Sequence, residues 1–134
     1  MKFETDQIIR INTKFLEDYD LLSDRKDKNK GPFKNRKDVF MAAVAYGFLN
    51  DASAPVKNGH DLFRTATFSI EDTVVLRSLF LRKNDMKFDD NYNESNIIKQ
   101  AMEWAEKGFE DLKNITIRYS NESNINCLID DIIG

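Results

Sequence analysis

The chain has 134 residues, of which 41% are hydrophobic and 32% are charged, and its formal net charge is −3 at pH 7. This composition is that of a globular chain with its own core and excludes a disordered one, and the length fits a single domain over residues 1–134. One cysteine, Cys127, and one histidine, His60, exclude an internal disulfide and a zinc site with the usual Cys and His ligands.

The sequence contains no segment that predicts secretion or membrane insertion. Residues 1–6 include no apolar signal-peptide core, and the longest uncharged run, residues 39–50, is too short to span a bilayer. We therefore expect a cytoplasmic protein that does not contact a membrane.

The first predicted elements are a short strand and a helix. Residues 3–11 alternate loosely, with Ile9 and Ile11 on one side, which predicts a short strand that leads into a helix. Asn12 or Thr13 can cap a helix over residues 14–23. This helix would carry one apolar stripe of Phe15, Leu16, Tyr19 and Leu22.

The next helix should lie at the centre of the fold. Residues 24–34 are polar and end in Gly-Pro, so the helix is predicted over residues 36–50, with Asn35 as its cap and Asp38 in its first turn. It is apolar on nearly every face, and Gly47 and its alanines would allow a neighbour to approach closely. Residues 51–60 then read as a loop and residues 62–68 as a short extended segment.

Three further helices complete the prediction. Ser69 caps a helix that runs to residue 83, and Ser95 or Asn96 caps the longest helix, over residues 97–115. A short helix is expected over residues 125–133. In the helix that begins after Ser69, the inward residues should be Val74, Val75, Leu76, Leu79 and Phe80, and the outward ones Arg77, Arg82 and Lys83. The predicted fold class is mainly α with a minor β component: a compact domain of four to five helices with one or two short strands.

No catalytic or cofactor motif is present. Glycine-rich nucleotide motifs are absent, and His60 lies in a polar stretch that predicts a surface turn. The acid pairs Asp89-Asp90 and Asp130-Asp131 lack a companion histidine or a third ligand, so we interpret them as solvated charges. Trp104 and the phenylalanines lie on helical core faces and should pack rather than stack on bases. We therefore expect no enzyme activity, no cofactor and no metal.

The charge is distributed unevenly, because residues 25–37, the basic segment, carry seven basic residues and one acid. A basic segment on an acidic body can contact a polyanion, or it can simply keep a loop soluble. If it contacts DNA, the candidate residues are Arg10, Lys28, Lys30, Lys34, Arg36 and Lys37. The order strand, helix, loop, helix over residues 7–50 also resembles a ribbon-helix-helix DNA binder, in which Gln7 and Arg10 would be the polar readers.

Two stretches carry a family resemblance. The first contains Gly31-Pro32-Phe33, Lys37-Asp38-Val39-Phe40, Ala42-Ala43 and Gly47-Phe48, and the second is the run from Glu103 to Lys113. Together they resemble the Dnd system-associated protein 4 type, a small accessory family encoded beside bacterial DNA phosphorothioation modification-restriction genes. Residues 51–60 and the last predicted helix have no counterpart in that pattern.

The resemblance implies a setting, bacterial defence against foreign DNA, and carries over no active site. We therefore expect a non-catalytic accessory subunit of an antiviral DNA modification-restriction system that binds other protein subunits. The alternative is a small DNA-binding or regulatory protein that uses the basic segment. Weak DNA contact and homo-oligomer formation stay open at this point.

Overall fold

The computed structural model describes residues 2–23 and 32–121. In chain order these residues form strand β1 (Ile8–Asn12), a 3-10 turn (Thr13–Phe15), helix α1 (Leu16–Leu22), helix α2 (Arg36–Leu49), strand β2 (Gly59–Arg64), a second 3-10 turn (Thr65–Thr67), helix α3 (Ile70–Lys83) and helix α4 (Glu94–Asn121). The fold is mainly α with a minor β component, as the sequence predicts. The helix expected over residues 125–133 lies outside the described residues.

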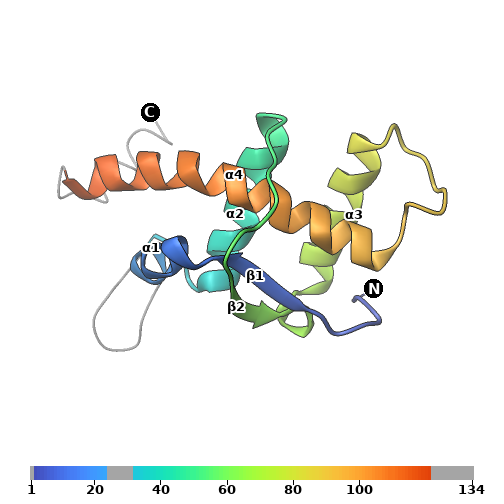
Figure 1. The fold of residues 1–134 in the computed structure, drawn as a ribbon, viewed down its shortest axis with the longest axis horizontal. Helices are drawn as coiled ribbons and strands as arrows, with labels where there is room; N and C mark the ends of the chain where they lie inside the picture. The colour runs from blue at the N-terminus through green and yellow to red at the C-terminus, as the bar shows by residue number, and fades with distance from the viewer. Residues whose placement is uncertain (1, 24–31, 122–134) are drawn as a thin grey trace.

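Helix α4 is the longest of the described elements, and it crosses α2 at very close range. Figure 1 shows α4 lying across α2, with α3 near one end of α4 and the two strands on the side of α1. A Cβ atom on Gly47 of α2 would collide with the backbone of Trp104, and one on Gly108 of α4 would collide with the carbonyl oxygen of Ala43. The two helix backbones therefore touch where the sequence predicts a close approach at Gly47.

The core between these elements is rich in aromatic rings. Among the described residues, five aromatic side chains are less than 2% exposed: Trp104, Tyr19, Phe40, Phe68 and Phe109. The ring of Tyr19 stacks on that of Phe109 with centroids 4.5 Å apart, and Phe40 meets Phe63 edge to face at 5.6 Å. The prediction that the aromatic rings pack in the core is confirmed for these five and is wrong for Phe88, which is 71% exposed.

The sheet has two antiparallel strands, and Ile9 and Ile11 of β1 are buried as predicted. The prediction for β2 is wrong in its bounds. Residues 51–60 were expected to be a loop and residues 62–68 to be extended, whereas β2 begins at Gly59 and ends at Arg64. The first residues of β2 are polar and exposed, so no alternation of apolar residues marks them, and pairing with β1 sets where this strand begins.

Helix α3 has the predicted bounds but a different inward face. Ser69 caps it in a capping box with Asp72. Val74 and Val75, predicted to be inward, are 51% and 45% exposed. The inward face consists of Thr73, Leu76, Phe80 and Leu81. Thr73 can take the core position because its hydroxyl donates to the carbonyl of Ile70 at 2.7 Å.

Helix α4 begins earlier than predicted, at Glu94, because Asn93 rather than Ser95 or Asn96 is its cap. The side-chain oxygen of Asn93 accepts a hydrogen bond from the backbone N–H of Asn96 at 2.9 Å. Three candidate cap residues stand close together here, and only the structure selects among them.

Ion pairs join α2 and α3 at both ends. Near their N-termini, Nζ of Lys37 lies 2.7 Å from Oδ2 of Asp72. At their C-terminal ends, Nζ of Lys83, the last residue of α3, lies 2.8 Å from Oδ1 of Asp51. The two helices therefore run in the same direction, and β2 lies in the connection between them.

Candidate interaction surfaces

The candidate DNA-contacting cations occupy different elements, and the first of them, Arg10, lies on β1. Its Nε atom is 2.8 Å from Oδ1 of Asp61, which lies on the neighbouring strand β2. Both side chains are more than half exposed, so the pair is a surface ion pair of little energetic weight. Its effect is electrostatic: the carboxylate offsets the positive charge that would attract a phosphate.

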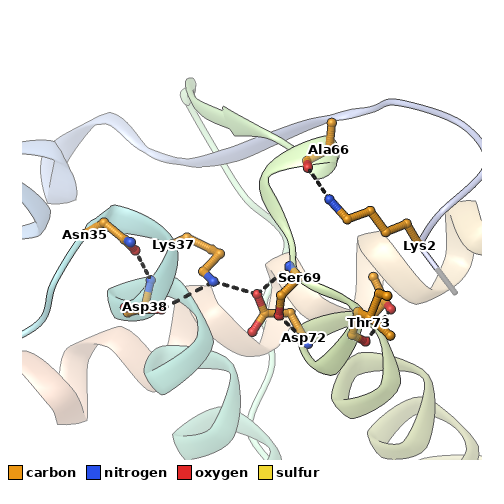
Figure 2. Close-up of polar contacts among 9 residues, drawn as sticks. Lys2, Asn35, Lys37, Asp38, Ala66, Ser69, Asp72 and Thr73 are labelled. Atoms are coloured by element: carbon orange, nitrogen blue, oxygen red, sulfur yellow. Dashed lines mark hydrogen bonds and ion pairs between the residues drawn. The ribbon is translucent and has the colours of Figure 1, made fainter.

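Arg36 and Lys37 open helix α2 and also meet carboxylates of the chain itself. Nε of Arg36 donates to Oδ1 of Asp20 at 2.7 Å, and Nη2 lies 2.6 Å from the same oxygen. Nζ of Lys37 lies between Asp72 at 2.7 Å and Asp38 at 3.6 Å, an arrangement visible in Figure 2. The hydrogen bond to Asp72 raises the pKa of Lys37, so this ammonium is firmly charged and held inside the fold's own network.

The pKa of Asp72 is shifted in the opposite direction to that of Lys37. Burial acts to raise the pKa of its carboxyl, but hydrogen bonds from Lys37 and from Ser69 outweigh burial and hold this pKa below the ordinary value. The backbone N–H of Ser69 donates to the carboxylate at 2.9 Å. Asp72 therefore serves the helix cap and the ion pair at once.

A cleft of about 380 Å³ lies where α1, α2 and β2 meet, and its lining includes Arg36, Lys37, Asp20, Leu62 and Phe63. Lys34, which is exposed, stands just before α2, and Lys28 and Lys30 lie outside the described residues. The structure thus brings Arg36 and Lys37 to one cleft, while Arg10 belongs to a separate ion pair with β2. In this cleft Arg36 pairs with Asp20, and Lys37 pairs with Asp72 of α3.

The pairing of β1 also bears on the ribbon-helix-helix likeness. In that class two strands pair to form the ribbon that enters the major groove. Here β1 pairs antiparallel with β2 of the same chain, with Ile9 opposite Phe63 and Ile11 opposite His60. Arg10, one of the two expected readers, is engaged with Asp61 on β2. His60 is exposed in this strand and does not lie in the turn that the sequence predicts.

Sequence reasoning missed a second polar cluster, at the start of α4. The carboxylate of Glu94 accepts hydrogen bonds from the backbone N–H groups of Glu4 at 2.8 Å and Thr5 at 3.0 Å. Nη2 of Arg77 lies 3.4 Å from Oε2 of Glu94. Arg77, predicted to be outward, is partly buried and covers the ring of Phe3 at 4.8 Å. Burial acts to raise the pKa of Glu94, but the two backbone N–H groups and Arg77 hold it below its ordinary value. This cluster fastens the N-terminal segment to α3 and α4.

Three exposed apolar side chains near the C-terminal ends of α2 and α3, which we name the end patch, were not recognisable in the sequence. The end patch consists of Leu49 at the end of α2, and Met86 and Phe88 in the segment after α3, which are 75%, 63% and 71% exposed. Near these helix ends Lys83 forms an exposed ion pair with Asp51, which has little energetic weight. Exposed apolar side chains of this size are ones that another molecule can cover.

The backbone beneath the end patch is strained. Asp85 and Met86 have φ angles of 56° and 61°, in the left-handed region. Aspartate tolerates this region, but for a methionine this conformation is unfavourable in free energy. Strained backbone of this kind concentrates at functional positions. The N–H of Met86 donates to the carbonyl of Leu81 at 2.7 Å, which fixes the turn. The fold thus holds Met86 outward in an unfavourable conformation.

The described part of the chain contains neither a metal-binding cluster nor a membrane-spanning helix. Within residues 2–23 and 32–121, no group of three or more His, Cys, Asp or Glu side chains is placed to hold a metal ion. None of the helices in those ranges has the length and apolar character needed to cross a membrane. Cys127 and the pair Asp130-Asp131 lie outside these ranges.

Comparison with known proteins adds no relative. No protein family, no curated protein and no solved structure matches this chain.

Proposed function

We propose that this chain is a non-catalytic accessory subunit that binds other protein subunits of a bacterial DNA modification-restriction system of the phosphorothioation type. The setting comes from the family resemblance of the segments around Phe40 and Trp104. The observation that supports a binding role is the end patch, where Leu49, Met86 and Phe88 expose more than 60% of their surface. Apolar side chains of this size are what protein partners bury at the centre of an interface.

The ion pairs of the basic residues favour a protein partner over DNA. Of the candidates that the structure describes, Arg10, Arg36 and Lys37 each lie within 3 Å of a carboxylate of the chain. A phosphate would have to compete with those carboxylates for the same donors. Binding driven by phosphate contacts needs several cations that are available together.

The strained turn allows a sharp test of the end patch. Met86→Gly removes the apolar side chain and also relieves the left-handed backbone, because glycine adopts positive φ without steric cost. We therefore expect this variant to melt at or above the wild-type temperature and to bind its partner more weakly. A gain or no loss in stability together with a loss in binding separates a functional side chain from a structural one.

The binding measurement is co-expression of the tagged chain with the phosphorothioation modification and restriction proteins, followed by affinity and size-exclusion chromatography. Wild type should co-elute with at least one of them, and Met86→Gly combined with Phe88→Ser should lose that complex. Val74→Glu, on α3 and away from the end patch, is the matched control and should retain it. Absence of a complex with all of these proteins, or DNA cleavage or saturable ATP binding by the isolated chain, contradicts the proposal.

A further inference from the structure

Helix α3 presents an exposed apolar strip on the side away from the core. Ile70, Val74 and Val75 are 54%, 51% and 45% exposed, and their spacing of four and five residues spreads them over about 140° of the helix circumference. Figure 1 shows α3 on the opposite side of the molecule from α1. The strip differs from the end patch, which lies beyond the C-terminal end of the same helix.

Two charged residues flank the strip, and their positions carry the inference. Glu71 lies in the first turn of α3 and Arg82 in the last, and both are exposed. Eleven residues are about three helical turns, so the two side chains lie at nearly the same angle and about 16 Å apart along the axis. No ion pair joins either of them to another described residue, in contrast to Asp72 and Lys83 on the same helix.

This acid-first, base-last pattern is complementary to itself in one orientation. If two copies of α3 lie antiparallel around a twofold axis level with the gap between Val75 and Ser78, Glu71 of each copy faces the partner's Arg82. In a parallel pair, Glu71 would face Glu71 and Arg82 would face Arg82, and both contacts would be repulsive. The charges therefore select the antiparallel orientation, as interface charges commonly do.

The apolar strip fits the same arrangement. Val74 and Val75 lie within one turn of the axis, so the valines of the two copies meet near its centre. Ser78 is small and exposed and allows the helices to approach closely there. Ile70 lies farther out, where the aliphatic stem of the partner's Arg82 can cover it.

We propose that this side of α3 is a self-association surface, at which a second copy of the chain docks with its α3 antiparallel. One pair of 14-residue helices buries a small area compared with the roughly 1,200 Å² or more of stable complexes, so the dimer should be concentration-dependent. The inference goes beyond the proposed function, because it assigns a different surface and a different partner.

A charge swap tests orientation and partner together. Sedimentation equilibrium of wild type from about 1 to 500 µM should show conversion from monomer to dimer. Glu71→Arg and Arg82→Glu should each weaken the dimer by about tenfold, because each single change makes both symmetric contacts repulsive. The double variant carrying both changes restores opposite charges across the axis and should return the dissociation constant to within about threefold of wild type.

The apolar contribution needs its own variant. Val74→Glu should abolish the dimer across this range, while Met86→Gly, in the end patch, should leave it intact. Circular dichroism checks that every variant is folded. A wild-type chain that stays monomeric to 500 µM overturns the inference, as does a dimer that tolerates Val74→Glu or is not restored by the charge swap.

These outcomes are separate from those of the proposed function. A monomer that still binds the modification-restriction proteins defeats self-association alone. A dimer that binds none of them defeats the accessory role alone.

Discussion

At the scale of single residues, the least satisfied part of the core surrounds Glu106 on α4. Its Oε1 accepts a hydrogen bond from Asn12 at 3.2 Å, whereas its Oε2 is buried without a partner among the described residues. The hydroxyl of Tyr19 is also buried without such a partner. Burial raises the pKa of Glu106, and burial together with the charge of Glu106 raises the pKa of Tyr19. The surroundings of Glu106 therefore favour its protonated form.

This environment predicts a pH-dependent effect of Glu106→Gln. A carboxyl with a higher pKa in the folded chain stabilises the fold fully below its unfolded value, near 4.5, and this contribution is lost as pH rises through the folded value. Glutamine resembles the protonated acid and retains an acceptor for Asn12. The variant should therefore melt above wild type at pH 7 to 8, with a difference that shrinks towards pH 4.

Thermal denaturation followed by circular dichroism at a series of pH values measures this difference. Glu17→Gln, which changes an exposed carboxyl on α1, is the control and should show no such pH-dependent gain. A Glu106→Gln variant that melts below wild type at neutral pH would show that the charged form contributes to the fold.

Phe40 supplies a second prediction at this scale. Its side chain is completely buried and meets the rings of Phe63 and Phe68. Phe40→Ala should cost about 3–5 kcal/mol, the sum of lost burial and a cavity. Urea denaturation measures it, with Leu49→Ala on the same helix as the exposed control. A cost below about 1 kcal/mol would contradict the central position of α2.

The sequence predicts the burial of Phe40 and Trp104 correctly but fails for Phe88, Val74 and Val75, which are exposed. Phe40 and Trp104 have no stable alternative to the core, and the structure places both there. The sequence places Val74 and Val75 in the core because they are hydrophobic, but both are exposed. Thr73 occupies the core position, because its hydroxyl donates a hydrogen bond to a carbonyl of its own helix and is therefore satisfied. If threonine is allowed at core positions, the sequence pattern orients α3 correctly.

At the scale of elements, predictions succeed where the determinant is local. Asn35 and Ser69 fix the starts of α2 and α3 because a cap and its target N–H lie three residues apart. The bounds of β2 depend on β1, which lies far away in the sequence. The candidate cations were identifiable by residue type, but their partners were not. Arg10 meets Asp61, and Lys37 meets Asp72, only because separate elements pack together.

The crossing of α2 and α4 predicts an unusual result for a glycine in a helix. Gly108→Ala should raise helix propensity by about 1 kcal/mol. The new Cβ, however, would collide with the carbonyl oxygen of Ala43 and the backbone nitrogen of Gly47. Neither is the end of a flexible side chain, so the helices must move apart. The net result should be a loss of about 2 kcal/mol or more.

Urea denaturation of Gly108→Ala provides the measurement. Lys107→Ala, at the exposed neighbouring position, is the control and should change stability by less than about 0.5 kcal/mol. A stabilised Gly108→Ala variant would mean that the two helices do not touch at this point.

At the scale of the whole molecule, the charge distribution predicts weak attraction to DNA. The net charge is −3, and three described candidate cations are engaged with carboxylates. Fluorescence anisotropy with labelled duplex DNA should therefore show hardly any binding near 150 mM salt. Lys28→Gln, Lys30→Gln and Lys34→Gln together should change nothing further. Tight binding that this variant loses, with a salt slope reduced by about 0.9 for each lost contact, would favour the DNA-binding alternative.

The close crossing of α2 and α4 joins two segments that are synthesised at different times. Gly47 leaves the ribosome well before Gly108, and at about 5–20 residues per second this interval is roughly 3–12 s. During that time α2 has no partner for the side it will press against Trp104, and β1 pairs only once β2 has emerged. Until α4 has emerged, α2, the most apolar of the described helices, therefore lacks the helix that covers it, and chaperones and proteases can reach it during this interval.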